Sequence, residues 1–331
     1  MKKSIALLAL VVSGALVSFE AKCNGVMPTE RTHRSFAPLT PAELESRERI
    51  RAHVQMLSGT IGGRNAVRYE GLRRAADYIE SELRSCSYRP ERQPFSVDGQ
   101  KFENVEAELG SSTANAKGIV IVGAHYDTAG GFPGANDNGS GVAAGLELAR
   151  HFARQKFRHA IRWVFFTNEE PPYFQTKDMG SYVYAKRCRE RGENVLAMLS
   201  LETIGYYSTE PGSQSYPVSI HPGYPNRGDF LGFVSNFKSA GLLRSALRSF
   251  RRATSLPAAG AAAPASIPGI AWSDQWAFWE FGYKALMLTD TAPYRYPYYH
   301  TAEDTPEKLD YDRLARAATG IAAIVNDLGS R

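Results

Sequence analysis

Hydrophobic and polar positions follow two different patterns along this chain. From residue 118 onward, short runs that are almost entirely apolar are followed by longer segments in which apolar residues recur every three or four positions. The runs are typical of strands buried on both faces, and the longer segments are typical of helices that cover such strands. The expected pairs are 118–127 with 139–155, 160–170 with 180–192, 195–205 with a long insertion, and 283–291 with a tail helix at 309–328. This alternation predicts an α/β fold with a mostly parallel mixed sheet that helices cover on both faces.

Two helices are expected before this alternating region. Residues 41–57 have a helical period, and Thr40 and Pro41 suit the cap and the first turn of a helix. Residues 69–85 have a second amphipathic period, after a glycine-rich stretch at 58–65 that we expect to be a loop. Both helices are expected to complete the same globule as the sheet.

Two further segments carry weaker patterns. Residues 92–97 and 101–109 are expected to be strands on either side of the turn residues Asp98 and Gly99, which predicts a hairpin. Residues 253–268, within the long insertion, are of low complexity, and we expect a mobile loop there. We assign no chemistry to that loop.

Composition limits the number of domains and the class of partner. The chain has 331 residues, of which 43% are hydrophobic and 22% are charged, which suffices for one large core or at most two domains. The formal charge of +5 is mild, and no run of Lys and Arg interleaved with aromatics resembles a nucleic-acid-binding stripe. We therefore predict a single domain over residues 41–330 that does not bind nucleic acid.

The first residues have the pattern of an export signal. Two lysines precede an apolar stretch that is short for a membrane span, and this stretch contains small residues that suit signal-peptidase cleavage. We expect a signal peptide at 1–21, a linker at 22–40 and a mature protein that is periplasmic or secreted, with membrane contact only through the signal segment. An uncleaved anchor is the alternative.

Cysteine usage adds little. Cys23, Cys86 and Cys188 are too few for a disulfide framework and do not have the spacing of a metal site. Cys86 and Cys188 could pair in an oxidising compartment, and the sequence leaves this open.

Acidic or imidazole side chains follow each of the four expected strands of the alternating region. They are His125 and Asp127, Glu169 and Glu170, Glu202, and Asp290. In an open parallel sheet the ligand crevice lies beyond the carboxyl ends of the strands, so these side chains are expected to meet at one edge. So many carboxylates repel each other strongly unless cations neutralise them. The pattern therefore predicts a cation site.

Two loops supply further candidate ligands. Asp137 lies in the glycine-rich segment 131–141, which opens a helix, and His300 lies in the segment 296–305, before the tail helix. Imidazole and carboxylate ligands without clustered cysteines favour zinc or a similar divalent metal over calcium.

Five short motifs, in their order along the chain, resemble those of the co-catalytic zinc exopeptidases. They are HYDT at 125–128, GANDNGSG at 134–141, FTNEE at 166–170, SLETIG at 200–205 and YYHTAEDTPEKLD at 298–310. That family includes bacterial leucyl aminopeptidases and, more distantly, glutaminyl cyclases and glutamate carboxypeptidases. The resemblance extends over roughly residues 41–330 and implies an exopeptidase that uses two zinc ions per chain.

The resemblance also implies ligands for each metal. His125 and Glu202 would bind the first zinc ion. Glu170 and His300 would bind the second, and Asp137 would bridge the two. In this family the peptide bond after the bridging aspartate tends to be cis. Many relatives carry Asp where this chain has Glu202. Glutamate also supplies a carboxylate, on a side chain that is longer by one methylene.

The residues that carry the reaction follow from the same resemblance. Glu169 would be the general base that takes a proton from the attacking water. Asp127 would orient His125, and Tyr299 would polarise the scissile carbonyl. Gln275 stands where relatives often carry His, a difference that we expect to alter the substrate pocket.

The implied activity is that of an aminopeptidase, which hydrolyses N-terminal bonds of a peptide substrate with a hydroxide held between two zinc ions. The alternative within the family is a glutaminyl cyclase, which keeps a single zinc and performs intramolecular acyl transfer. A non-catalytic binding module on the same fold is a further alternative, disfavoured because no ligand is lost. Carboxypeptidase action, the preferred residue and the oligomeric state stay open.

Overall fold

The computed structural model describes residues 36–111, 118–217 and 224–331. The expected signal peptide at 1–21, the greater part of the expected linker and Cys23 lie outside the described residues.

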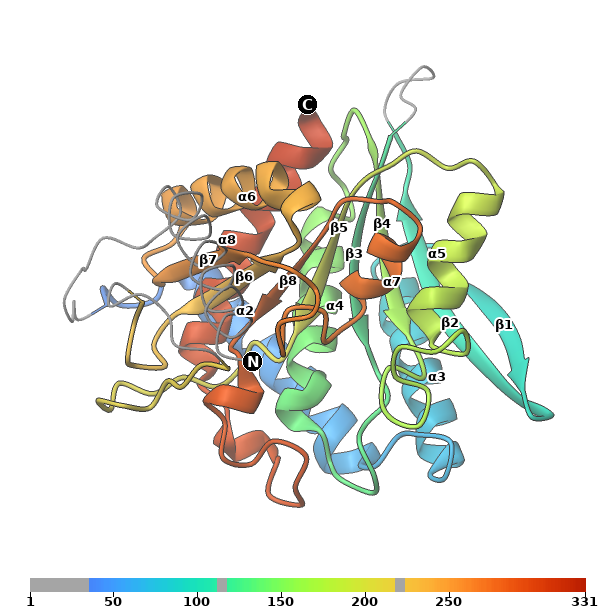
Figure 1. Ribbon diagram of the computed structural model, residues 1–331, viewed down its shortest axis with the longest axis horizontal. Coiled ribbons are helices and arrows are strands. Elements are labelled where there is room, and N and C mark those ends of the chain that lie inside the picture. Colours follow the sequence, from blue (N-terminus) through green and yellow to red (C-terminus); the bar gives the residue numbers. More distant parts are fainter. Residues whose placement is uncertain (1–35, 112–117, 218–223) are drawn as a thin grey trace, which may run out of the picture.

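One eight-stranded mixed sheet runs through the molecule in the order β1-β2-β4-β3-β5-β8-β6-β7 (Figure 1). The central strands β4, β3, β5 and β8 are parallel to one another, whereas β1, β2 and β4 are joined by antiparallel pairings. At the other end, β6 is antiparallel to β8 and parallel to β7. The strands span Glu91–Val97 (β1), Gln100–Leu109 (β2), Ile119–His125 (β3), Ala160–Phe166 (β4), Val195–Glu202 (β5), Leu231–Ser235 (β6), Ala258–Ala262 (β7) and Ala285–Thr289 (β8).

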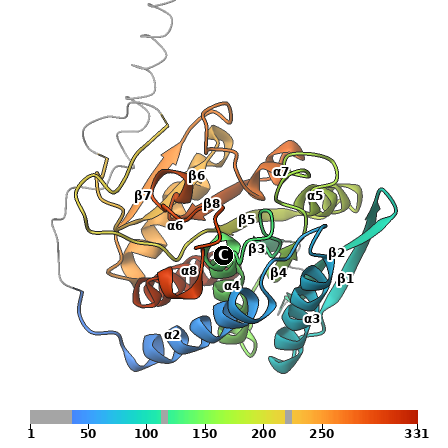
Figure 2. The same ribbon diagram turned by 90° about the horizontal axis from the view of Figure 1, so that it is seen from below.

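Helices cover both faces of the sheet, which confirms the predicted α/β architecture (Figure 2). The larger core lies beneath α2 (Pro41–Val54), α3 (Tyr69–Ser85), α4 (Gly141–Phe152), α6 (Ala240–Ala253) and α8 (Tyr311–Ser330). The smaller core, on the opposite face, lies beneath α5 (Gly180–Glu190) and α7 (Gln275–Glu280).

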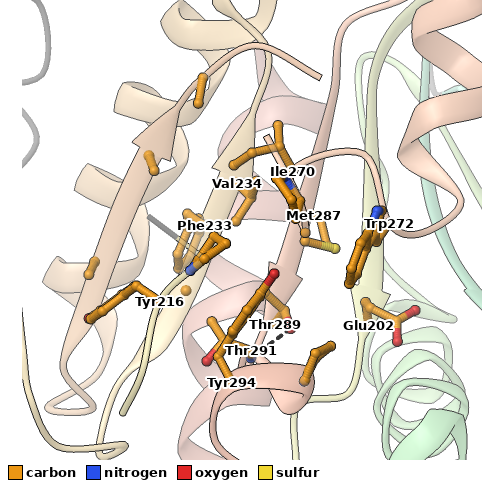
Figure 3. Close-up of a pocket in the computed structure, with 18 of the residues that line it drawn as sticks. Glu202, Tyr216, Phe233, Val234, Ile270, Trp272, Met287, Thr289, Thr291 and Tyr294 are labelled. Carbon is orange, nitrogen blue, oxygen red and sulfur yellow. Dashed lines mark hydrogen bonds between the residues drawn. The ribbon is translucent and has the colours of Figure 1, made fainter. Parts of the chain in front are cut away.

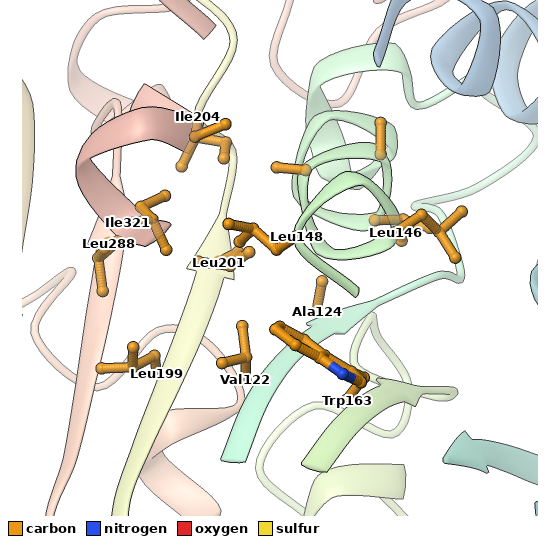
Figure 4. Close-up of a cluster of buried hydrophobic side chains, with 14 of the residues drawn as sticks. Val122, Ala124, Leu146, Leu148, Trp163, Leu199, Leu201, Ile204, Leu288 and Ile321 are labelled. Carbon is orange, nitrogen blue, oxygen red and sulfur yellow. The ribbon is translucent and has the colours of Figure 1, made fainter. Parts of the chain in front are cut away.

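The central strands are buried on both sides, as their continuous apolar runs require. All seven residues of β4 are buried, and alternate residues enter different cores. Trp163 packs in the larger core with Val122 and Leu201 (Figure 4), whereas Val164 and Phe166 pack in the smaller one. Burial of an apolar side chain of this size contributes about 1.5–3 kcal/mol, so the strand ends stand on a rigid base.

The first helix begins where its sequence predicts and ends later than expected. The Thr40 hydroxyl accepts a hydrogen bond from the Glu43 amide (3.2 Å), and the Glu43 carboxylate accepts one from the Thr40 amide (2.9 Å). The stretch 58–65 is not entirely a loop, because the π-helical turn η1, Gln55–Ile61, continues the helix into it. Leu57 is fully buried in the larger core, and this burial outweighs the low helix propensity of Gly59.

Two other predictions in the N-terminal part are confirmed. Helix α3 occupies the predicted residues 69–85. The β1–β2 hairpin turns at Asp98 and Gly99, whose φ angles of 49° and 82° are those of a two-residue hairpin turn.

The prediction of a mobile loop over 253–268 is wrong for part of that segment. Strand β7 lies within it and pairs in parallel with β6, at the end of the sheet, and α6 packs against both. Alanine and glycine give no alternating hydrophobic signal and have low strand propensity. Pairing with β6 and cover by α6 therefore decide the conformation.

Neither a disulfide nor a membrane-spanning helix occurs in the described ranges. Cys86 and Cys188 are free thiols, and Cys188, a residue of α5, is buried in the smaller core. No helix there combines the length and the apolar character needed to cross a bilayer.

Candidate metal centre

Three parallel strands bring the predicted site residues to one edge of the sheet. His125 is the last residue of β3 and Glu202 the last of β5, and Glu169 and Glu170 follow shortly after β4. Because β3 lies between β4 and β5, the carboxyl ends of these strands adjoin, as predicted.

Two loops add a residue each to this edge. Asp137 lies in the short segment η2, Ala135–Ser140, at the start of α4, and its peptide bond to Asn138 is cis, as the resemblance implies. His300 lies in the loop before η5, Pro306–Lys308. Both side chains reach the strand ends from outside the sheet.

The first group of potential ligand atoms surrounds His125. Its Nε2 lies 3.2 Å from Asp137 Oδ1 and 3.2 Å from Glu202 Oε2. All three side chains are buried, and their ligand atoms lie within 4.8 Å of one another.

The second group surrounds His300. Its Nε2 lies 3.0 Å from Asp137 Oδ2 and 3.4 Å from Glu170 Oε2, again with all ligand atoms within 4.8 Å of one another. The two groups contact different oxygens of Asp137, so a single carboxylate belongs to both.

The donor atoms of these groups fit divalent cations. His125 Nε2, Asp137 Oδ1, Glu170 Oε1 and His300 Nε2 are buried and have no hydrogen-bond partner among the described residues. A buried polar atom without a partner costs about 1–3 kcal/mol, and a cation at the centre of each group would satisfy these atoms. Imidazole and carboxylate are the ligands that zinc takes in proteins.

The electrostatics of the cluster lead to the same conclusion. Burial raises the pKa of Glu170 to about 7, and the neighbouring Asp137 carboxylate adds to the shift. Burial also raises the pKa of Glu169 and of Glu202. Burial lowers the pKa of His300, but its contacts with Asp137 and Glu170 outweigh burial and raise that pKa to about 10. The cluster therefore retains protons unless cations replace them.

Asp127 holds the backbone of the two glutamates that follow β4. Its Oδ1 accepts the backbone N–H of Glu169 and its Oδ2 accepts that of Glu170, both at 3.1 Å. The same Oδ1 lies 3.5 Å from Nδ1 of His125. One buried carboxylate thus holds the backbone of the glutamate pair and lies beside the imidazole of the first group, without a hydrogen bond to it.

The two glutamates make different contacts, although both also lie within 4.8 Å of His125 in a third possible set of ligand atoms. Glu170 contacts His300, whereas Glu169 Oε2 lies 3.9 Å from His125 Nε2. Tyr299 stacks on His300 with ring centroids 3.9 Å apart. Burial raises the pKa of Tyr299 above its usual value, so its hydroxyl stays protonated at neutral pH.

Sequence reasoning missed residues that hold these ligands in place. The Ser273 hydroxyl donates to Glu202 Oε2 at 2.7 Å. The buried Asp304 carboxylate accepts the backbone N–H groups of Asn136 (2.8 Å) and Asp137 (3.1 Å). Asp304 lies inside the HTAED segment, so a carboxylate four residues after His300 was the available signal.

Two expected participants lie outside the cluster. Asp290 follows β8, as predicted, but its carboxylate accepts from the Asn136 side chain (2.9 Å) and the Tyr206 amide (2.8 Å), and it belongs to neither ligand group. Gln275 is fully buried and donates to the Ile270 carbonyl at 3.1 Å. It therefore supports a loop of the neighbouring pocket and does not line that pocket itself.

That pocket is an apolar trough that begins at Glu202 (Figure 3). In the strand register Glu202 of β5 pairs with Thr289 of β8, Thr289 with Gly232 of β6, and Gly232 with Ala259 of β7. Paired residues point to the same face of a sheet, so this row forms a floor, and beyond Glu202 its residues are small. The loop containing Trp272 and the segment at 291–294 cover it, and we call this space the trough.

Comparison with known proteins shows the family. Residues 104–325 match peptidase family M28. The chain is 34% identical over 297 residues to the uncharacterized protein YfbL of Escherichia coli (strain K12), which covers 87% of this chain and 90% of that protein. It is 27% identical over 212 residues to leupeptin-inactivating enzyme 1 of Streptomyces exfoliatus, covering 62% of this chain and only 46% of that longer protein.

Solved structures share the fold. The zinc aminopeptidase BSAP from Bacillus subtilis superposes with a TM-score of 0.69 at 16% identity, covering 86% of this chain and 95% of that one. The glutaminyl cyclase of Porphyromonas gingivalis superposes with a TM-score of 0.64 at 19% identity, covering 85% and 98%. From the profile match and the YfbL relationship together, the chain is a member of peptidase family M28.

Proposed function

We propose that this chain is an exported aminopeptidase that uses two zinc ions to hydrolyse the N-terminal bond of a peptide. The observation that carries the proposal is the sharing of Asp137 between two ligand groups through opposite oxygens. A site for a single cation needs only one such group. The N-terminal signal pattern supports a periplasmic or secreted location.

The metal ions would be held by the two groups described above. His125, Asp137 and Glu202 would hold the first, and Asp137, Glu170 and His300 the second. Zinc in such a pair supplies Lewis acidity, which polarises a carbonyl and lowers the pKa of water toward neutrality.

Glu169 is the general base of the proposed reaction. Its carboxylate takes a proton from the attacking water and delivers that proton to the leaving amine. Burial raises its pKa, and cations bound beside it would oppose that shift, so that the carboxylate could first accept a proton and then keep it until the amine leaves. Asp127 fixes the Glu169 backbone through its hydrogen bond and so sets the position of the base.

Tyr299 is one of the residues that line the trough. Its protonated hydroxyl can donate to the scissile carbonyl oxygen, where negative charge develops during attack. Stacking on His300 holds the ring of Tyr299 next to the second group.

The trough favours recognition of an amino terminus with a large apolar side chain. None of its described lining residues is Lys, Arg or His, so none of them can pair with a terminal carboxylate. Its volume of about 140 Å³ is close to the roughly 150 Å³ of an apolar cavity that holds benzene. We therefore propose a preference for N-terminal aromatic residues, with the side chain seated over Gly232 and Ala259.

A panel of substrates and a metal determination test this proposal. Purified protein should contain close to two equivalents of zinc, release the aminoacyl residue from unblocked phenylalanyl and leucyl anilides, and leave N-blocked substrates intact. A glutaminyl cyclase is the second candidate, since one of the similar folds is that of such an enzyme. One tightly bound zinc, together with cyclisation of N-terminal glutaminyl peptides, would favour that candidate instead.

A further inference from the structure

Arg64 is a buried cation to which the proposed reaction gives no role. It lies between η1 and α3, and its side chain is fully buried. Among the residues that the structure describes, no carboxylate forms an ion pair with its guanidinium. A charged group in such a position is costly unless many hydrogen bonds satisfy it, so its presence needs a physical reason.

The guanidinium of Arg64 donates only to backbone carbonyl oxygens. Its Nε donates to the carbonyl of Tyr126 at 2.8 Å, and Nη2 donates to that of Gly134 at 3.0 Å. Nη1 contacts three carbonyl oxygens, those of Leu57 (2.9 Å), Gly62 (2.9 Å) and Pro133 (2.7 Å).

These contacts join the two loops that carry Asp127 and Asp137. Tyr126 immediately precedes Asp127, and Pro133 and Gly134 begin the turn that ends at Asp137. The backbone of Arg64 adds to the first connection, because its N–H donates to the Thr128 hydroxyl (3.0 Å) and its carbonyl accepts the Thr128 N–H (2.7 Å).

Asp304 holds the same turn from the other side. Its carboxylate accepts the N–H groups of Asn136 and Asp137, and its carbonyl accepts that of Ala135 at 3.1 Å. Within 133–137, the Arg64 guanidinium therefore binds carbonyl oxygens, and the Asp304 carboxylate binds N–H groups. The packing is close, since a Cβ at Gly134 would lie 2.4 Å from the Asp137 carbonyl oxygen and 3.2 Å from Arg64 Nη2.

Arginine suits this position for reasons of geometry and charge. Only its planar guanidinium offers five N–H donors in a fixed arrangement, whereas lysine offers three from one atom. Burial lowers its pKa to about 10, with the carboxylates of Asp304, Asp127 and Asp137 opposing the shift, so the group stays charged at neutral pH. Its charge also partly offsets those buried carboxylates.

We infer that Arg64 is a positioning residue of the metal centre: it fixes the Asp127 loop and the Asp137 loop relative to each other before a cation binds. The conformational entropy of these loops is then lost when the chain folds and not when the cation binds. The affinity for the cation is therefore higher. This inference rests on the proposed metal site, and it concerns affinity and geometry, not the reaction catalysed.

The test compares Arg64→Lys with Arg162→Lys. Arg162 is also buried, but it pairs with Glu108 and Glu193 at the start of β4, far along the strand from the site. Both variants keep the charge and should lower thermal stability. Only Arg64→Lys should weaken zinc in a chelator competition, by the roughly 10–100-fold usual for a group that supports metal ligands, and only it should change the visible spectrum of the cobalt-substituted protein.

Two results would overturn the inference. Arg64→Lys with wild-type zinc affinity and an unchanged cobalt spectrum would leave Arg64 with a purely structural role. If Arg64→Lys does not fold, Asp304→Asn provides the second measurement, because it loosens the same turn from the other side. Unchanged zinc affinity in Asp304→Asn would then refute the idea that order in this turn sets affinity. Wild-type protein that binds neither metal would instead refute the proposed function.

Discussion

The metal centre and the trough share Glu202 but are built in opposite ways. In the metal centre, buried polar side chains converge, and charged residues such as Asp127 hold the backbone that carries them. In the trough, three strands present side chains as small as those of Gly232 and Ala259, and the space that they leave makes the site. The metal centre depends on particular polar side chains, whereas the trough depends on residues small enough to leave an open space. We therefore expect substitutions in the first to act on metal and rate, and in the second on the choice of substrate.

The largest expected effect belongs to the glutamate pair. Glu169→Gln preserves shape but removes the basic oxygen, so the rate should fall by about two to four orders of magnitude while zinc stays bound. Glu170→Gln replaces a charged ligand with a neutral one, so zinc should bind more weakly and the rate should partly return as zinc is added. Zinc stoichiometry and rate across a zinc titration measure both. Loss of metal from Glu169→Gln alone would mean that the two roles are exchanged.

Glu202 lies where the two regions meet, and its substitution should show which one it serves. Glu202→Ala removes a ligand of the first group and should weaken zinc by at least the roughly 10–100-fold that loss of a supporting group costs. Glu202→Asp keeps a carboxylate and should retain much of the activity. Chelator competition on both variants provides the measurement. Equal and negligible effects would remove Glu202 from the metal centre and leave it as a wall of the trough.

Changing the pH should affect the metal centre and leave the trough unaltered. The pKa of Glu170 is raised to about 7 and that of His300 to about 10, so at neutral pH His300 holds a proton and Glu170 is about half protonated, and zinc must displace these protons. Zinc affinity should therefore rise by about tenfold per pH unit between about 7 and 10, where only His300 releases a proton, and more steeply below about 7, where Glu170 releases one as well. Competition titrations at several pH values give the slope. The ratio of phenylalanyl to alanyl turnover in zinc-saturated protein should stay constant, and a parallel change in that ratio would show that the regions are coupled.

The smallest effect is expected at the far end of the trough. Ala259→Leu fills space above β7, and should lower kcat/KM for a phenylalanyl substrate relative to an alanyl one by about tenfold, with zinc content unchanged. Ala262→Leu is the matched control, because alternate residues of a strand point to opposite faces and this side chain points away from the trough. If both variants behave alike, the aromatic side chain does not reach β7.

The metal centre was more readable from sequence than the trough, and the reason is physical. Parallel strands bring their carboxyl ends together, so the sequence alone predicts that His125, Glu202 and the glutamate pair lie near one another. Their roles in the reaction stay predictions. The same reasoning was wrong for Asp290, whose carboxylate binds the Asn136 side chain. The end of a strand fixes the position of a residue's backbone but not the partner that its side chain contacts.

The groups that support the site were less visible. Arg64 is a single residue in a glycine-rich stretch, and its partners are backbone carbonyls that the fold alone brings near. Strand β7 gave no signal, because Ala and Gly have neither the alternation nor the propensity that marks a strand. Features made by backbone contacts or by missing side chains depend on long-range pairing, which local sequence does not encode.

The row that connects Glu202, Thr289, Gly232 and Ala259 has a further consequence. Neighbouring strands are about 4.8 Å apart, so each step along the row lies one fixed increment farther from the metal ligand, and Ala259 lies about 14 Å away. Descendants of this chain could therefore change the length of side chain that they accept through one codon at a time. Enlarging the residue at Ala259 would shorten the longest side chain that fits, whereas a side chain at Gly232 would have to displace its neighbours, since a Cβ there would lie 3.1 Å from the Thr289 carbonyl oxygen. The catalytic apparatus would be inherited unchanged.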